Sequence, residues 1–148
     1  MYKIFLIFLL LPISLFSQRI YRNNSTYSSD VLFNIRDGRV YNKNSNYSND
    51  ILLTIKDNKI YKGNSTFSSN LLYIIKGEVV YKYREQTNNI VLNKRYGIVY
   101  RNNSSYSSDI LLRINGNKIY QLNRIIFNTE EPIDLIKLTA ILHLLQMI

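Results

Sequence analysis

The chain repeats one sequence pattern about every twenty residues, and this repeat constrains the fold more than any other feature. A tyrosine that follows Ile or Val recurs at Tyr21, Tyr41, Tyr61, Tyr81, Tyr100 and Tyr120. Between these tyrosines lie four well-matched copies, 21–40, 41–60, 61–80 and 100–119, and one poorly matched copy, 81–99, that is one residue short. A fixed period of this length predicts an array of equivalent units that share one core.

Each copy has the pattern of a β-hairpin. An apolar run such as 51–56 is followed by a two-residue turn and by a second short run such as 59–62. The turn dipeptides are Asp37-Gly38, Asp57-Asn58, Gly77-Glu78, Tyr96-Gly97 and Gly116-Asn117. Gly, Asp and Asn tolerate the positive φ that tight hairpin turns require. We therefore predict a mainly β fold, with the hairpins in a rolled or closed array over residues 18–122. A parallel β-solenoid with one coil per copy is the alternative.

The turn positions also predict the register of each hairpin. With the turn at 37–38, Ile35 opposes Val40 and Asn34 opposes Tyr41. Strict alternation then places four apolar residues of this copy on one face: Val31, Phe33, Ile35 and Val40. The opposite face holds the repeated tyrosine and a second apolar row: Leu32, Leu52, Leu72, Val91 and Leu111. Because both faces are partly apolar, the pattern favours hairpins that are packed on both sides.

The first seventeen residues have the features of a secretory signal peptide. Lys3 precedes the apolar run 4–11, Pro12 follows it, and Ser14 and Ser17 supply the small residues of a cleavage site. The run is shorter than the ~20 residues of a membrane-spanning helix. We expect cleavage after Ser17 and a secreted or periplasmic mature protein without a transmembrane segment; an uncleaved anchor is the alternative.

The last segment, 123–148, is expected to form a capping helix that closes the open end of the array. Thr129 can cap its N-terminus, with Glu130, Glu131 and Pro132 in the first turn. The following residues are apolar almost all round, which is typical of a helix that is buried in its own domain. Insertion into a membrane surface or a partner's groove is the alternative.

The composition excludes several kinds of site. The chain has no Cys, which excludes disulfides, thiolate metal sites and a thiol nucleophile, and its one histidine is His143. Asp30, Asp50 and Asp109 recur just before the first strand of a copy, and Asn70 replaces them once. Such spacing predicts a structural hydrogen bond, with hydrolysis as the alternative. We expect no enzyme activity, no catalytic residues, no metal and no cofactor.

Charge and aromatic residues supply the candidate ligand-binding site. The formal net charge is +9, and cations follow the repeated tyrosine in most copies. The candidates are the aromatic residues between hairpins, Tyr27, Tyr47, Phe67 and Tyr106, and the cations Lys43, Lys62, Arg84 and Arg101. Stripes of cations attract polyanions. Because export makes nucleic acid an unlikely partner, the expected ligand is an anionic glycan or another envelope component; a solvated surface and packing between hairpins are the alternatives.

The recurring Ile-Tyr pair, the Ser-containing connector and the Gly-containing turn resemble small secreted repeat proteins of Flavobacteria and other Bacteroidetes. The pattern is also similar to the fourfold β-flower domain, over about residues 19–122. This resemblance implies a compact, flower-like hairpin array in an exported protein and brings no known activity.

The sequence as a whole predicts an exported, non-catalytic repeat protein that acts as a structural or binding module. The alternative is an adhesin-like binder of anionic envelope glycans through basic and tyrosine stripes. Open ends of the array are expected to allow pairing between copies of the chain.

Overall fold

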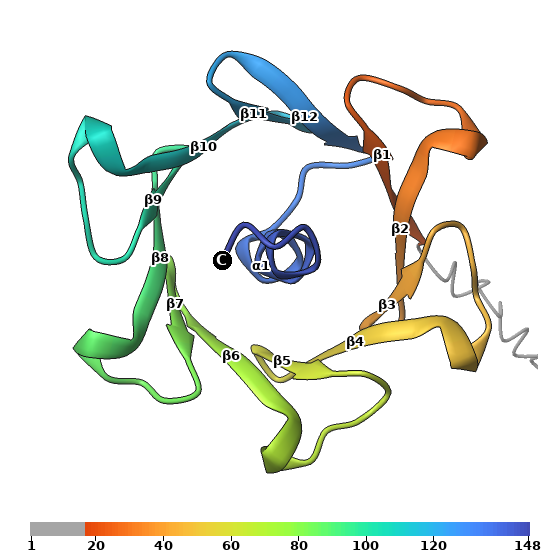
Figure 1. Cartoon of the computed structure of the whole chain (residues 1–148), viewed down its shortest axis with the longest axis horizontal. Helices are drawn as coiled ribbons and strands as arrows, with labels where there is room; N and C mark the ends of the chain where they lie inside the picture. The colour runs from red at the N-terminus through yellow and green to blue at the C-terminus, as the bar shows by residue number, and fades with distance from the viewer. Residues whose placement is uncertain (1–16) are drawn as a thin grey trace, which may run out of the picture.

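The hairpins close into a ring. The structure, a computed structural model, describes residues 17–148, so that the expected signal peptide lies outside the described residues except for Ser17. All twelve described strands belong to one closed antiparallel barrel, in which β1 pairs with β12 (Figure 1). The prediction of a mainly β array of hairpins is confirmed, and the alternative of a parallel solenoid is wrong.

The strands follow one another around the ring in chain order. They are β1 (Gln18–Arg22), β2 (Val31–Arg36), β3 (Arg39–Asn42), β4 (Ile51–Lys56), β5 (Lys59–Lys62), β6 (Leu71–Lys76), β7 (Val79–Lys82), β8 (Ile90–Arg95), β9 (Ile98–Arg101), β10 (Ile110–Asn115), β11 (Lys118–Gln121) and β12 (Arg124–Thr129). The helix α1 (Leu135–Leu144) follows them. Single 3-10 turns precede five strands: η1 (Ser28–Asp30), η2 (Ser48–Asp50), η3 (Ser68–Asn70), η4 (Thr87–Asn89) and η5 (Ser107–Asp109).

The barrel has two different ends. The two-residue hairpin turns, 37–38, 57–58, 77–78, 96–97 and 116–117, lie at one end, which we call the tip end. The connectors 23–30, 43–50, 63–70, 83–89 and 102–109, together with the short turn 122–123, lie at the other, the connector end. Asp37 and Gly38 both have positive φ, as the turn chemistry requires, and Ile35 pairs with Val40 as predicted.

A β-bulge in every repeat changes which residues face the core. Val40 pairs with Leu53 and Tyr41 with Ile51, so that Leu52 is an extra residue between two pairs. The equivalent extra residues are Leu32, Leu72, Val91, Leu111 and Ile126. All six contact or belong to the central hydrophobic cluster. The prediction that this apolar row shares the outer face with the repeated tyrosine is wrong, because a bulge interrupts the alternation that the prediction assumed.

The sixth hairpin is divided between the two ends of the described chain. Tyr21 of β1 pairs with Asn128 of β12, in the same way as Tyr41 pairs with Asn34 inside the first continuous hairpin. Phe127 is fully buried and corresponds in register to Phe33. The strands therefore continue past residue 122, where the array was expected to end, and β12 completes the ring.

The helix lies inside the ring rather than over its end (Figure 1). Leu138, Ile141 and Leu142 are fully buried and belong to the same hydrophobic cluster as the inward-facing strand residues. Asp134 caps α1 by accepting a hydrogen bond of 2.9 Å from the backbone N–H of Lys137. The expected cap, Thr129, is instead the buried last residue of β12. Among residues 17–148, no helix is long and apolar enough to span a membrane.

The direction of α1 follows from its neighbours. Asp134 and Leu135, where the helix begins, line a small cavity together with Asn58 and Gly77 of the tip end. His143, close to its last residue, lies beside Tyr73 near the connector end. The helix thus fills the lumen from the tip end to the connector end, and its apolar circumference is matched by a ring of inward side chains.

We predict that the helix is an integral part of the core. Leu138→Ala should lower the free energy of unfolding by about 2–5 kcal/mol, because it leaves a cavity where α1 meets the barrel. Urea denaturation followed by circular dichroism measures this change. Leu122→Ala is the matched control, since Leu122 is 93% exposed and its truncation removes no packing. Equal stability of the two variants would contradict a lumen packed around α1.

Candidate functional site

Four connectors share one conformation, and each holds an aromatic side chain at its apex. In the second connector, the backbone N–H of Tyr47 donates to Ser45 Oγ at 3.2 Å, and Ser45 Oγ donates to Asp50 at 2.5 Å. The same two bonds recur around Tyr27 and Tyr106. Around Phe67, the backbone N–H still donates to Ser65 Oγ, but Asn70 replaces the aspartate. The Asn70 side-chain amide therefore donates to Ser65 Oγ, where an aspartate would accept from it. The repeated carboxylates thus fix the connectors in shape.

Buried polar side chains attach several connectors to the outer face of the barrel. Asn34 donates to the backbone carbonyl of Ser45 at 3.1 Å, and Thr54 donates to that of Gly63 at 2.7 Å. Asn93 bonds the connector 102–109 through the carbonyls of Asn102 and Ser104. These anchors fasten three of the connectors to the barrel, and the connectors project outward from the ring in Figure 1.

The four apical aromatic side chains are exposed to solvent. Tyr27, Tyr47, Phe67 and Tyr106 have 73–76% of their surface accessible, so they do not fill the gaps between hairpins. Tyr83 and Leu122 are also exposed on this end, whereas Tyr96 lies at the tip end. Six of the seven large exposed hydrophobic residues among residues 17–148 therefore belong to the connectors or to the turn 122–123. Because these exposed side chains recur at equivalent positions of the repeat, they form a candidate interaction surface.

The cations of the connector end form two groups. Arg22, Lys62, Lys82 and Arg101, which we call the mouth cations, occupy the same position in four repeats, the last residue of a strand. Lys62 pairs with Leu53 and Lys82 with Tyr73, so their side chains lie on the lumen side of the barrel. Lys43 and Arg84 instead belong to the connectors themselves. None of these six cations forms a salt bridge within the part of the chain that the structure describes.

The structure thus divides the predicted site residues by their place in the repeat. The connectors carry the four aromatic residues, Lys43 and Arg84. Lys62 and Arg101 are strand residues at the connector end of the lumen. Arg22 and Lys82 were not among the candidates, although they occupy the same position after the repeated tyrosine. Their shared position directly after the repeated tyrosine is the sequence signal that identifies Arg22 and Lys82 as candidates. In the fourth connector, Gln86 stands where the others carry an aromatic residue.

His143, in the last turn of α1, lies beside Tyr73 and near two of the mouth cations, Lys62 and Lys82. Its Nδ1 is 3.1 Å from the hydroxyl of Tyr73, and the two rings meet edge to face. Burial lowers the pKa of His143 below its ordinary value of 6.5, and the charges of Lys82 and Lys62 lower it further. Burial also raises the pKa of Tyr73. A neutral imidazole that accepts the tyrosine hydrogen bond explains this packing.

The repeated acids are spread around the ring. Asp30, Asp50 and Asp109 lie on three separate connectors, each bonded to a serine of its own connector. Within residues 17–148, no three His, Asp or Glu side chains come together in a group that could hold a metal ion. The acids therefore serve the shape of the connectors, and the cations and aromatic residues carry the surface chemistry of this end.

The fold and its equivalent connectors define a flower-shaped ring of β-hairpins. The family model described as "6-fold beta flower protein" matches residues 18–141, and the chain belongs to this family. The flower-like architecture expected from the resemblance is thus confirmed, with six hairpins in place of the fourfold arrangement. Searches of curated proteins and of solved structures found no match.

The position of His143 predicts a dependence of stability on pH. Its pKa is lowered in the folded protein, so the unfolded chain binds a proton first as the pH falls through about 6.5. The free energy of unfolding should therefore fall between about pH 7.5 and about pH 5.5. Urea titrations at several pH values measure it. His143→Gln, which cannot titrate, should remove most of this fall; an unchanged pH profile in that variant would contradict the assignment.

Proposed function

We propose that this protein is an exported, non-catalytic binding module whose connector end binds anionic envelope glycans. The observation that carries the proposal is the set of four equivalent connectors, each holding an exposed aromatic side chain in the same backbone conformation. Tyrosine presents a large, rigid contact surface with a polar hydroxyl at low cost in conformational entropy. A surface that is fixed before binding loses little freedom when a ligand arrives.

The mouth cations support an anionic ligand. Arg22, Lys62, Lys82 and Arg101 lie near the base of the connectors and have no described acidic partner. Clustered cations that have no acidic partner concentrate anions near the surface and raise the rate at which anions associate. A glycan that carries carboxylate, sulfate or phosphate groups along its length satisfies both the aromatic side chains and the cations.

The ring geometry favours a repeating ligand. The connectors of Tyr27, Tyr47 and Phe67 are consecutive around the barrel, so equivalent contacts recur at regular angular steps. Several weak contacts on one polymer raise the overall affinity far above that of a single contact. A polysaccharide is therefore a better match than a small molecule for the aromatic part of this surface.

The non-catalytic part of the proposal rests on how the polar groups are used. The repeated carboxylates are engaged by serine hydroxyls, and His143 is engaged by Tyr73. Each of these serines also accepts a hydrogen bond from the backbone of its own connector, and the aspartates lie on three separate connectors rather than as the carboxylate pair that glycosyl transfer needs. The closed ring also pairs every described strand on both sides, so pairing between copies would have to use another surface than a strand edge.

The export part of the proposal predicts the start of the mature chain. The charged residue, apolar run and small residues of 1–17 should direct secretion and be removed after Ser17. N-terminal sequencing or intact mass measurement of protein recovered from the periplasm or the medium should give Gln18 as the first residue. Recovery of a membrane-bound chain that retains residues 1–17 would contradict cleavage and favour the uncleaved anchor.

The binding part is tested with a matched pair of polymers, dextran sulfate and neutral dextran. We expect residues 18–148 to bind dextran sulfate, measured by biolayer interferometry, and to bind dextran at least about tenfold more weakly. Binding should weaken steeply from about 0.05 M to about 0.5 M salt, because screening shortens the reach of the mouth cations. A short single-stranded DNA tests the competing nucleic acid class.

Two variants separate the contributions. Replacing Tyr27, Tyr47 and Phe67 by Ala should weaken dextran sulfate binding by about tenfold or more, while the tip-end control Tyr96→Ala leaves it unchanged. Lys62→Gln with Lys82→Gln should reduce the salt dependence, and Lys56→Gln at the tip end should not. Absence of binding by the folded protein, or equal losses in the controls, would refute the proposal; tighter binding to DNA would move it to nucleic acids.

A further inference from the structure

The strand pairing of the sixfold repeat is shortened between β10 and β11. The other five hairpins keep a final pair at the connector end: Phe33 with Asn42, Leu53 with Lys62, Tyr73 with Lys82, Leu92 with Arg101, and Phe127 with Arg22. The corresponding pair of Leu112 with Gln121 is not formed in the described chain, where the β10–β11 pairing begins at Arg113. The two strands therefore diverge at the connector end.

A missing backbone hydrogen bond shows the same divergence. In the other five repeats, the residue after the strand donates its N–H to the carbonyl of a bulge residue, as Lys43 does to Leu32 at 2.9 Å. Within residues 17–148, Leu122 makes no such bond to Leu111. The reason is the short turn 122–123, which keeps Gln121 paired with Arg124 on the other side of β11.

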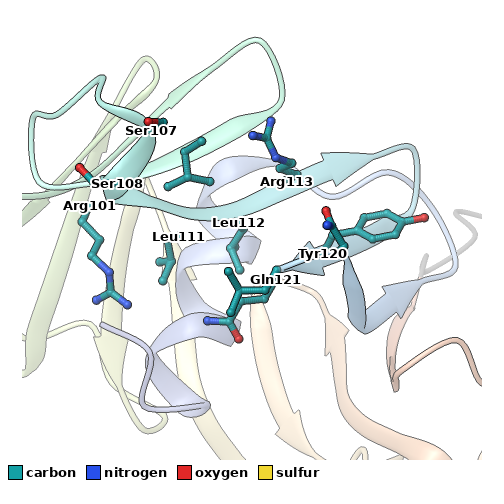
Figure 2. A pocket seen from close by; sticks show the side chains of 11 residues that line it. Arg101, Ser107, Ser108, Leu111, Leu112, Arg113, Tyr120 and Gln121 are labelled. Atoms are coloured by element: carbon teal, nitrogen blue, oxygen red, sulfur yellow. The ribbon is translucent and has the colours of Figure 1, made fainter.

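The divergence opens a cavity of about 590 Å³ between the two strands. Its apolar wall includes Leu111 and Leu112, and its polar lining includes Arg101, Arg113, Gln121 and the serines at 107 and 108. Figure 2 shows Arg101 and Gln121 on one side of β10 together with these leucines, and Arg113 on its other side. This volume lies in the range of small-molecule sites, about 300–1,000 Å³.

Two arginines without acidic partners give the cavity its chemistry. Arg101 and Arg113 form no salt bridge among the described residues. Arg113 occupies the position at which Asn34, Thr54 and Asn93 anchor a connector in other repeats. Because the connector after β11 is reduced to a two-residue turn, this side chain has no loop to hold. The Arg113 guanidinium thus stands at an anchor position whose connector is absent.

We infer that this cavity binds a single anionic sugar residue, such as a uronic acid. A carboxylate matches the planar donor fork of Arg101, and the Gln121 amide lines the same cavity. The serine hydroxyls meet sugar hydroxyls, and the exposed Leu122, which also lines the cavity, meets the apolar face of the sugar ring. The inference takes its ligand class from the proposed function. It assigns a site at the base of the connector 102–109, which shares Arg101 with the mouth cations and binds one sugar residue, while the aromatic side chains of the connectors contact the length of the polymer.

The test uses monosaccharide probes, which are too small to join several connectors. D-glucuronate, D-glucose and inorganic phosphate are titrated into ¹⁵N-labelled protein and followed by NMR. We expect shifts of the Gln121 and Arg113 amides with D-glucuronate, and at least about tenfold weaker binding of D-glucose, because the sugar then lacks the charge that Arg101 recognises. Equal affinities for D-glucuronate and D-glucose, or for D-glucuronate and phosphate, would overturn the inference.

Variants identify the site. Arg101→Ala should weaken D-glucuronate binding by about tenfold or more, and Arg101→Lys should restore only part of it, since lysine keeps the charge but lacks the fork. Arg95→Ala removes the same group at the tip end and should leave binding unchanged. An equal loss in the Arg95 variant would refute the assignment.

One further variant separates this inference from the proposed function. The triple alanine variant at Tyr27, Tyr47 and Phe67 should retain D-glucuronate binding while its binding of dextran sulfate falls. If dextran sulfate binds the native protein and D-glucuronate does not, the cavity assignment falls and the proposed function stands. If D-glucuronate binds and dextran sulfate does not, the proposed function falls and the cavity remains as an isolated sugar site.

Discussion

The pairing of β1 with β12 is the interaction on which the rest of the structure depends. Hairpins that share a core with their neighbours leave two open edges until the first strand meets the last. Ile20, Phe127 and Asn128 occupy the register positions of a continuous hairpin, so closure adds a sixth equivalent unit. Closure also creates the lumen that buries α1, and it holds the connectors at regular steps around one end of the barrel.

The hairpin register could be predicted from the sequence because turn chemistry and alternation act locally. The pairing of Asn34 with Tyr41 follows directly from a turn at 37–38. The bulge at Leu52 could not be predicted, because an extra residue is visible only when the neighbouring hairpin supplies the partner strand. The sixth hairpin carries a signal, since Phe127 and Asn128 repeat Phe33 and Asn34, but its two halves lie at opposite ends of the chain.

The candidate site was predictable where it follows the repeat and hidden where it departs from it. Tyr27, Tyr47, Phe67 and Tyr106 could be found by their common place in the pattern, and their exposure follows from connectors held by serine and by buried anchors. Arg113 has no such signal, because its role depends on two strands that separate in space. A departure from an otherwise regular repeat is thus as informative as the repeat itself.

The divided hairpin has a consequence for how the protein is made. Ile20 and Thr129 are 109 positions apart (129 − 20), so the closing pair forms only after nearly the whole chain is available. Non-local contacts of this kind slow folding, because the chain loses the entropy of loop closure before the contacts form that stabilise the closed state. A chain that lacks β12 and α1 would keep an open strand edge and an unfilled lumen. The ring can therefore close only once β12, the last strand, has been made.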